Sequence, residues 1–328
     1  MRAMAADPTG RRLVAVERPL PQPGPHELLL QVLACGVCRT DLHLVDGELP
    51  PHGTLVVPGH EIVGRVVAQG SAARRFEPGQ RVGVPWLGGS CGTCEFCAGG
   101  RENLCDRPVF TGWDRDGGFA DYATADERFC FALPDRYDDR HAAPLLCAGL
   151  IGHRAWRMAG DGAKRIGLYG FGAAAHLLCQ LAVAHGQQVF AFTRAGDDRS
   201  QAFARSLGAG WAGGTDERPP EPLDAALLFA PAGQLVPQAL RAVRKGGTVV
   251  CASIHMSDIP SFPYSLLWGE RVLRSVANLT RADGEAFLRL AAGIGLQVHV
   301  QPFALADANA AVQAVRAGRV DGAAVLVP

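Results

Sequence analysis

Reactive side chains are concentrated in residues 34–43, which include two cysteines, an arginine, a threonine, an aspartate and a histidine. They follow the apolar run 27–33, which predicts a buried strand that ends at this cluster. A second run of β-branched residues precedes His60 and Glu61. Cysteine and histidine ligands delivered from two strand ends, with acids beside them, are typical of a tetrahedral zinc site. The alternative is that the two cysteines are buried apolar thiols and that His60 is a core histidine.

The most specific metal motif is a set of four closely spaced cysteines, namely Cys91, Cys94, Cys97 and Cys105. Their short spacings let one turn direct several sulfurs at the same ion, and neighbouring glycines supply the backbone freedom that this requires. Four thiolates leave no open coordination position, so we predict a closed, structural zinc site in the lobe 91–105. An iron–sulfur cluster, a redox pair or a nucleic-acid-binding zinc ribbon would use the same residues, although few basic residues flank this motif.

Cys147 is a single thiol within the apolar sequence 142–149. By itself such a thiol is most simply a core residue. Joined to Cys38 and His60, it would complete a set of three protein ligands with a fourth position open, which is the pattern of a catalytic zinc.

The glycine-rich sequence 170–175 lies between a predicted strand and a predicted helix, and a further strand follows. This is the context of a dinucleotide-binding G-x-G-x-x-A motif. In such a motif Gly170 makes the tight turn, Gly172 admits a pyrophosphate, and Ala175 lets the helix pack closely on the strand. The helix N-terminus would supply backbone amides for the phosphates. The alternative is a purely structural glycine turn.

Hydrophobic patterning indicates two kinds of domain. Short, closely spaced strand-like runs before residue 149 predict a β-rich, barrel-like domain. After residue 149, strands and helices alternate at the spacing of βαβ units, which predicts a parallel sheet. The predicted strands are 27–33, 62–68, 165–169, 188–192, 223–229, 247–253, 272–277, 298–303 and 323–327, and 76–84 is predicted as a turn followed by a strand. The predicted helices are 176–185, 200–207, 235–243, 283–292 and 306–317.

Length, charge and cysteine content narrow the class of protein further. The 328 residues favour two domains, and 32 basic residues balanced by 32 acidic ones argue against nucleic-acid or polybasic membrane partners. The uncharged sequence 166–193 is long enough to span a bilayer, but its glycines, histidines and glutamines favour a buried strand–helix–strand unit. The N-terminus has no apolar signal-peptide core. Ten cysteines then indicate metal ligation or catalysis rather than disulfides, and we expect a cytoplasmic protein.

Taken together, the motifs resemble those of the zinc-containing medium-chain alcohol dehydrogenases, and the resemblance covers nearly the whole chain. The matching segments are Cys-Gly-Val-Cys-Arg-Thr-Asp at 35–41, Gly-His-Glu at 59–61, the four-cysteine lobe at 91–105, Cys147, and the glycine motif that begins at Gly170. The resemblance implies an α/β fold in which a GroES-like β-rich catalytic domain spans 1–148. It implies a Rossmann domain with a doubly wound parallel sheet over 149–277 that binds the cofactor, and a return of 278–328 to the catalytic domain.

The resemblance also implies roles for the residues of the first cluster. A catalytic zinc would be held by Cys38, His60 and Cys147, with Glu61 beside it. Asp41 would accept a hydrogen bond from His60 and so fix the tautomer of this ligand. Zinc would act as a Lewis acid that makes a bound alcohol lose its proton near neutral pH, after which hydride passes to the nicotinamide.

Further roles follow from the same resemblance. Thr40 and His43 would relay the alcohol proton through the cofactor ribose to solvent, and Arg39 would meet the pyrophosphate. Trp86 would line the substrate pocket and favour small primary alcohols, although it could instead be a core aromatic residue.

The predicted ribose-binding position is unusual, because Thr193 and Arg194 occupy it where members that prefer NAD have an aspartate. An arginine without an acid can accommodate a 2′-phosphate, which favours NADP slightly over NAD. Against this, Asp197 and Asp198 follow closely and could repel that phosphate.

We therefore predict a zinc-dependent alcohol dehydrogenase or aldehyde reductase with two zinc ions per chain. It would transfer hydride reversibly between a small alcohol or aldehyde and NAD(P), as a homodimer or homotetramer. One alternative is a polyol or sugar-alcohol dehydrogenase, which is less consistent with Cys147 and the full lobe. The other is a cofactor-binding relative without turnover, which is less consistent with the presence of Cys38, Thr40 and His43.

Overall fold

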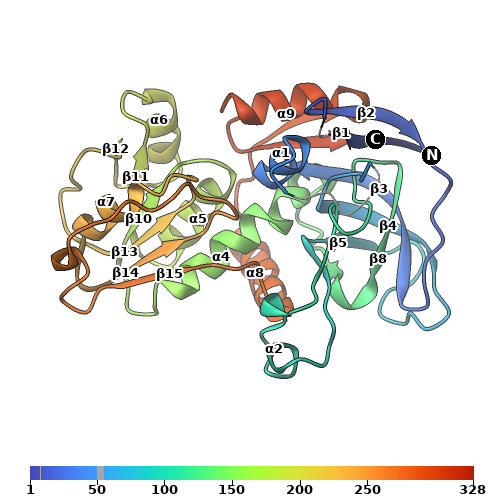
Figure 1. Cartoon of the computed structure of the whole chain (residues 1–328), viewed down its shortest axis with the longest axis horizontal. Helices are drawn as coiled ribbons and strands as arrows, with labels where there is room; N and C mark the ends of the chain where they lie inside the picture. The colour runs from blue at the N-terminus through green and yellow to red at the C-terminus, as the bar shows by residue number, and fades with distance from the viewer. Residues whose placement is uncertain (8, 50–54) are drawn as a thin grey trace. The chain divides into compact units, whose positions relative to one another are not determined.

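The computed structural model describes residues 1–7, 9–49 and 55–328, and the chain divides into two compact units (Figure 1). The first unit contains Met1–Cys147, Thr280–Ala292 and Val298–Pro328, and the second contains Ala148–Leu279 and Gly293–Gln297. The segment Gly293–Gln297 thus groups with the second unit, whereas the sequence favoured assigning all of 278–328 to the first.

The first unit is built on a seven-stranded sheet with the strand order β16-β17-β3-β4-β5-β9, in which β8 also pairs with β3. Its strands are β1 (Arg2–Asp7), β2 (Arg12–Glu17), β3 (Glu27–Val37), β4 (Glu61–Gln69), β5 (Arg81–Val84), β6 (Leu87–Gly89), β7 (Val109–Phe110), β8 (Tyr122–Asp126), β9 (Phe131–Ala132), β16 (Val300–Ala304) and β17 (Ala323–Val327). Its helices are α1 (Arg39–Val45), α2 (Glu95–Ala98), α3 (Asp139–Ala142), α9 (Ala308–Arg316) and most of α8 (Arg281–Ile294).

The pairing of β3 with β4 positions the first reactive cluster. The two strands are antiparallel, and Gly36 near the end of β3 lies opposite Glu61 at the start of β4. The C-terminal end of one strand therefore meets the N-terminal end of the other. Leu28 and Leu30 of β3 and Ile62 of β4 are fully buried in the same hydrophobic core, which fixes this register.

The second unit contains a six-stranded parallel sheet with the order β12-β11-β10-β13-β14-β15. Its elements are α4 (Ala148–Met158), β10 (Arg165–Tyr169), α5 (Ala173–Ala184), β11 (Gln188–Thr193), α6 (Asp198–Ser206), β12 (Trp211–Gly214), β13 (Leu223–Leu228), α7 (Leu235–Ala242), β14 (Val243–Cys251) and β15 (Val272–Ser275). The order reverses at β10, as in a doubly wound dinucleotide-binding sheet, so the glycine motif that follows β10 lies at the switch point.

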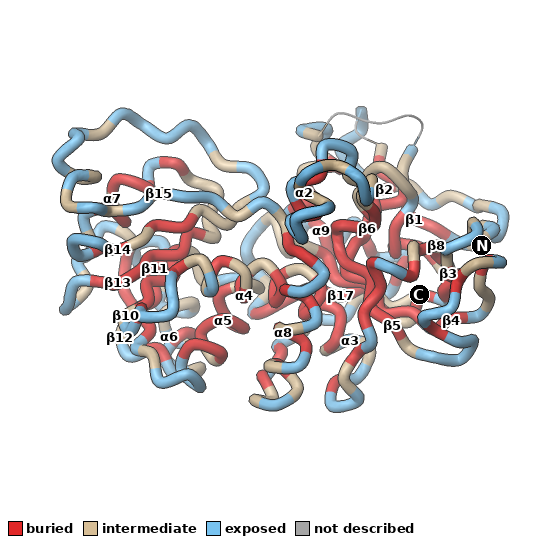
Figure 2. Tube along the Cα trace, turned by 90° about the horizontal axis from the view of Figure 1, so that it is seen from below, coloured by how far each residue is buried: buried red, intermediate tan, exposed pale blue. Residues whose placement is uncertain are grey.

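Burial in this sheet follows from its parallel topology. Every residue of β13 is buried, as expected for a central strand with helices on both faces. Figure 2 shows that the buried residues follow the strands within each unit. The uncharged sequence 166–193 forms β10, α5 and β11, as the strand–helix–strand interpretation predicts. Among the described residues, no helix has the length and apolar character needed to cross a membrane.

Candidate functional site

Three segments of the first unit bring four potential metal ligands together. Cys38 follows β3 as the N-cap of α1, His60 and Glu61 stand at the start of β4, and Cys147 ends a short 3-10 turn. One ligand atom from each of these residues lies within 4.8 Å of the others. The structure thus collects the three ligands predicted from the sequence, with Glu61 beside them.

The charges of Cys38 and His60 stabilise each other, so the pKa values of these two groups are shifted in opposite directions. Cys38 Sγ lies 3.1 Å from His60 Nε2. Hydrogen bonding to Cys147 and the charge of His60 hold the pKa of Cys38 well below its usual value. Burial lowers the pKa of His60, but the charges of Cys38 and Asp41 outweigh it and raise this pKa well above its usual value. Two thiols and an imidazole within 4.8 Å of one another are the donor types that zinc prefers, so the donor set fits zinc.

Asp41 connects the two segments that supply these ligands. Its fully buried carboxylate accepts the backbone N–H of Cys38 at 2.8 Å and that of Gly59 at 3.1 Å. Thr40 N–H in turn donates to Cys38 Sγ at 3.3 Å. His60 Nδ1 lies 3.4 Å from Asp41 Oδ1, which is within ion-pair distance but outside hydrogen-bond geometry. The predicted hydrogen bond between the side chains of His60 and Asp41 is therefore replaced by a charge interaction at close range. The Asp41 carboxylate instead accepts hydrogen bonds from the backbone N–H groups of Cys38 and Gly59.

Glu61 occupies its position because Gly36 has no side chain. A Cβ atom on Gly36 would lie 1.7 Å from Glu61 Oε2. Glu61 is 2% exposed, and burial raises its pKa well above the usual value. The glycine between the two cysteines of the first motif is thus explained by the close approach of this carboxylate.

The predicted relay residues lie on α1, next to the ligand Cys38. Thr40 is buried, whereas the side chain of His43 is partly accessible, and Arg39 is exposed. His43 Nδ1 is hydrogen-bonded to Glu48 Oε2. This partner was not predicted, because no sequence motif connects Glu48 to the cluster.

An aromatic cluster stands beside His60. The ring of Trp86 lies edge-on to His60 at a centroid distance of 4.8 Å and stacks with Phe110 at 5.1 Å and Trp113 at 6.0 Å. Trp86 was predicted for the substrate pocket, but Phe110 and Trp113 were not. Their proximity depends on the pairing of β6 with β7, which no local sequence pattern indicates.

The four cysteines of the lobe also converge. Their sulfurs lie within 4.8 Å of one another, with Cys91 to Cys97 at 3.9 Å and Cys94 to Cys97 at 3.5 Å. Zinc–sulfur bonds of about 2.3 Å in a tetrahedron would separate the sulfurs by about 3.8 Å, so this donor set fits zinc. Hydrogen bonds from Thr93 and Cys94 lower the pKa of Cys91 to about 5, whereas burial raises that of Cys105 to about 11.

An ion pair between the buried Glu102 and the exposed Arg281 attaches the lobe to the rest of the first unit. Glu102 Oε1 accepts the backbone N–H of Arg281 at 2.9 Å and its guanidinium Nε at 3.0 Å. The Arg281 guanidinium also lies over the ring of Phe129, 5.1 Å from its centroid. Burial alone would raise the pKa of Glu102, but the hydrogen bonds from Arg281 outweigh it and hold this pKa below its usual value.

The glycine motif of the second unit has the geometry that a dinucleotide site requires. Gly170 has a φ of +87°, and a Cβ atom there would lie 3.0 Å from Ala230. Gly172 is the N-cap of α5 and has open space where a side chain would be, while Ala175 is fully buried. A pyrophosphate could therefore approach the backbone at the N-terminus of this twelve-residue helix.

At the predicted ribose position, Thr193 and Arg194 differ in availability. The buried Thr193 hydroxyl lies 3.0 Å from Arg194 O and accepts a hydrogen bond from Gln201 at 3.2 Å. It is thus engaged within the protein. Arg194 is exposed, so of the two side chains it is the one that can reach a ligand.

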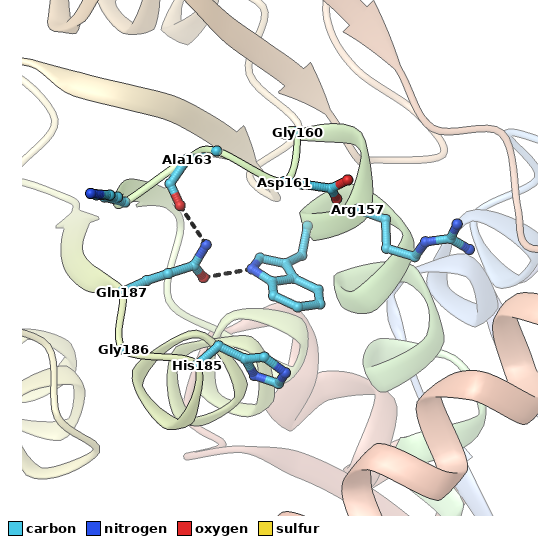
Figure 3. A pocket seen from close by; sticks show the side chains of 10 residues that line it. Arg157, Gly160, Asp161, Ala163, His185, Gly186 and Gln187 are labelled. Carbon is cyan, nitrogen blue, oxygen red and sulfur yellow. Dashed lines mark hydrogen bonds between the residues drawn. The ribbon is translucent and has the colours of Figure 1, made fainter.

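A separate pocket in the second unit is lined by residues that precede β10 and β11 (Figure 3). In it, Trp156 Nε1 donates to Gln187 Oε1 at 2.6 Å, and the Gln187 amide donates to Ala163 O at 2.7 Å. These residues lie at the N-terminal edge of the parallel sheet. Since ligands of doubly wound sheets bind beyond the C-terminal ends of the strands, this pocket is not the cofactor site.

The fold and the two cysteine clusters define a zinc-binding medium-chain dehydrogenase with a GroES-like domain, and the comparisons agree. Residues 24–135 match the model of the alcohol dehydrogenase GroES-like domain. The chain is 47% identical to "Probable alcohol dehydrogenase AdhA" of Mycobacterium tuberculosis (strain CDC 1551 / Oshkosh), over 94% of this chain and 90% of the relative. The chain belongs to the zinc-containing medium-chain alcohol dehydrogenase family.

Solved structures with the same fold are known with either cofactor. An acetophenone reductase from Geotrichum candidum NBRC 4597, in complex with NAD, is 26% identical with a TM-score of 0.90, covering 100% of this chain and 97% of that one. A chain from Sinorhizobium meliloti 1021, bound to NADP, is 27% identical with a TM-score of 0.87, covering 100% of both chains.

Proposed function

We propose that this alcohol dehydrogenase transfers hydride reversibly between a small primary alcohol or aldehyde and NAD(P). The observation that carries the proposal is the convergence of Cys38, His60 and Cys147 with Glu61, whose ligand atoms lie within 4.8 Å of one another. If the two cysteines and the histidine hold a zinc ion, the fourth position of the ion would be left for substrate. A zinc ion held there by Cys38, His60 and Cys147 would supply Lewis-acid chemistry that favours loss of the proton from a bound alcohol.

The surrounding residues of the chain orient the ligands and move the proton. Asp41 holds the backbones that carry Cys38 and His60, so both ligands keep their positions before metal binds. Thr40 would accept the proton of the bound alcohol at its hydroxyl, and His43 would pass it outward.

The aromatic cluster of Trp86, Phe110 and Trp113 supports an apolar, compact substrate. Three stacked rings beside His60 offer a hydrophobic wall and few hydrogen-bond partners. A polyol would leave its hydroxyl groups unpaired against such a wall. We therefore favour small primary alcohols over sugar alcohols.

The four cysteines of the lobe support a second, structural zinc ion. Two donor sets that fit zinc imply two ions per chain.

Arg194 supports a preference for NADP as the cofactor. Its guanidinium can pair with the 2′-phosphate of NADP, a charge-assisted contact worth roughly 1.5–3 kcal/mol. Relatives bind either cofactor, so this residue of the chain itself supports NADP over NAD. Gly170, Gly172 and Ala175 would receive the pyrophosphate of either.

We further propose that a second copy of the chain covers the edge of the parallel sheet. In the strand order β15 is the outermost strand, and no described strand lies beyond it. Large exposed side chains flank it, with Tyr264 72%, Trp268 62% and Val272 45% exposed. An open edge beside exposed aromatic residues is typical of a protein interface.

None of the ten cysteines, all of which are described, forms a disulfide, which supports a reducing, cytoplasmic location.

A spectrophotometric assay tests the function. Ethanol, hexanol, benzyl alcohol and a polyol are each offered with NAD and with NADP. We expect turnover of the small primary alcohols, with kcat/KM about ten- to a hundredfold higher for NADP. Thr193→Asp should move the preference toward NAD. Turnover of the polyol alone would overturn the substrate class, and a preference for NAD that survives Arg194→Ala would overturn the cofactor assignment.

A further inference from the structure

The turn after α1 places a carboxylate against the histidine of the proposed relay. Glu48 Oε2 is hydrogen-bonded to His43 Nδ1. The chain reverses here because Gly47 has a φ of +73°, a left-handed conformation that glycine adopts without strain. The Glu48 backbone N–H also donates to His43 O at 2.9 Å. Two contacts therefore hold the carboxylate against the imidazole ring.

This turn is anchored from a second element. Arg316 at the end of α9 donates to Asp46 Oδ1 at 2.5 Å, and Asp46 is the C-cap of α1. In Figure 1, α9 lies beside α1. Hydrogen bonds within the first unit thus hold the segment that carries Glu48 in place.

The exposed fraction of the side chain rises from Thr40 through His43 to Glu48. Thr40 is 7% exposed, the side chain of His43 is 13% exposed and that of Glu48 is 48% exposed. Glu48 therefore lies between the imidazole and bulk water. A group in this place is suited to exchange protons with both.

We propose that Glu48 is the outer proton acceptor of the relay and also sets the tautomer of His43. The inference rests on the proposed function, since it extends the relay of that reaction. The hydrogen bond to Glu48 keeps the proton of the neutral ring on Nδ1, which leaves Nε2 basic toward the incoming proton.

The step conserves protons and involves no change of oxidation state. A proton from the alcohol arrives at His43 Nε2 and gives an imidazolium. The Nδ1–H bond then breaks, and the proton passes to Glu48 Oε2, which leaves the ring with its proton on Nε2. The protonated Glu48 carboxyl releases its proton to water, and a ring exchange with solvent restores the starting tautomer.

The tautomer can be tested without turnover. Nitrogen-15 NMR of histidine-labelled, zinc-loaded full-length protein should show His43 protonated at Nδ1 in the parent. Glu48→Gln keeps a hydrogen-bond acceptor and should preserve this pattern, whereas Glu48→Ala should lose it. A parent ring protonated only at Nε2 would overturn the proposal.

The proton transfer is tested by comparing proton release with hydride transfer in a single turnover with NADP and ethanol. A pH-indicator dye in weak buffer reports the proton, and absorbance of the reduced cofactor reports the hydride. We expect Glu48→Gln and Glu48→Ala to slow proton release roughly tenfold, which is less than for a group inside the relay because water partly replaces an outer one. Formate, but not chloride at equal ionic strength, should restore the rate of Glu48→Ala.

Controls separate this inference from the function on which it rests. Glu17→Gln changes an exposed carboxylate of the same unit and should leave proton release unchanged. In a His43→Gln background, Glu48→Gln should add no further loss. If His43→Gln alone leaves proton release unchanged, the relay itself is wrong. If His43→Gln slows it but Glu48→Gln does not, only the role of Glu48 is overturned.

Discussion

The two cysteine clusters of the first unit use similar donors but are built in opposite ways. In the lobe, all four ligands come from the single segment 91–105, and three of them are only partly buried. In the other cluster, the ligands come from three separate segments and meet around the fully buried His60. A local cluster needs only a turn, whereas a dispersed one needs the whole fold. This difference is the physical basis for assigning stability to the first and chemistry to the second.

Removing one thiol from each cluster gives the largest contrast. Cys38→Ser removes a ligand of the dispersed cluster and should lower kcat/KM about 10³-fold or more, because Lewis-acid stabilisation is worth several kcal/mol. Its thermal midpoint should change little. Cys97→Ser should show the reverse, with a lowered midpoint and near-normal turnover of the folded fraction. Near-normal activity in Cys38→Ser would contradict the assignment of the two clusters.

The next-largest effect is expected from removing the Thr40 hydroxyl, which would accept the proton of the bound alcohol. Thr40→Ala removes the hydroxyl beside Cys38 and should lower kcat by about 10²–10⁴-fold, which is the usual contribution of general acid–base groups. Zinc content and thermal midpoint should stay at parent values, because the hydroxyl is not a ligand. Steady-state kinetics and metal analysis of the same preparation check this, and a rate within twofold of the parent would remove Thr40 from the relay.

Much of this architecture could be predicted from the sequence, because its signals are local. The doubly wound sheet with a β-rich domain is confirmed, and β10 and β17 begin and end where the hydrophobic pattern predicted. The strand β12 was not predicted, since it is four residues long and contains two glycines. The helix α4 was also missed.

The contacts that position the cluster were harder to foresee. The backbone bonds of Asp41, the close approach of Gly36 to Glu61, and the Glu48 partner of His43 all depend on three-dimensional pairing. No periodicity or motif encodes such pairings. The roles of the individual site residues stay predictions.

Gly36→Ala tests whether the dispersed cluster depends on close packing. The added methyl group would collide with Glu61, and overpacking of this kind typically costs about 1–3 kcal/mol. We expect a lower thermal midpoint and a tenfold or greater loss of activity. Gly293→Ala, where a Cβ meets open space on α8, is the control and should keep the activity of the parent without lowering the thermal midpoint. Equal behaviour of the two variants would show that Glu61 can move without consequence.

The smallest effect is expected from weakening the ion pair that attaches the lobe, between Glu102 and Arg281. Glu102→Gln keeps an acceptor oxygen but removes the charge that pairs with the exposed Arg281, so it should lower the free energy of unfolding by only about 0.5–1 kcal/mol at pH 7. Because the folded state depresses the pKa of Glu102, its contribution is present above the unfolded pKa of about 4.3 and is lost as pH falls through the folded value. Urea denaturation should therefore show a difference at pH 7 that shrinks below about pH 4. The exposed Glu95→Gln should show none at either pH.

Zinc analysis of the purified parent and of Cys38→Ser tests the central claim most directly. Two independent donor sets predict about two zinc ions per chain in the parent and about one in Cys38→Ser, with the remaining ion held by the lobe. A parent that binds only about one ion, or a Cys38→Ser protein that keeps both, would contradict the division into an open catalytic site and a closed structural one.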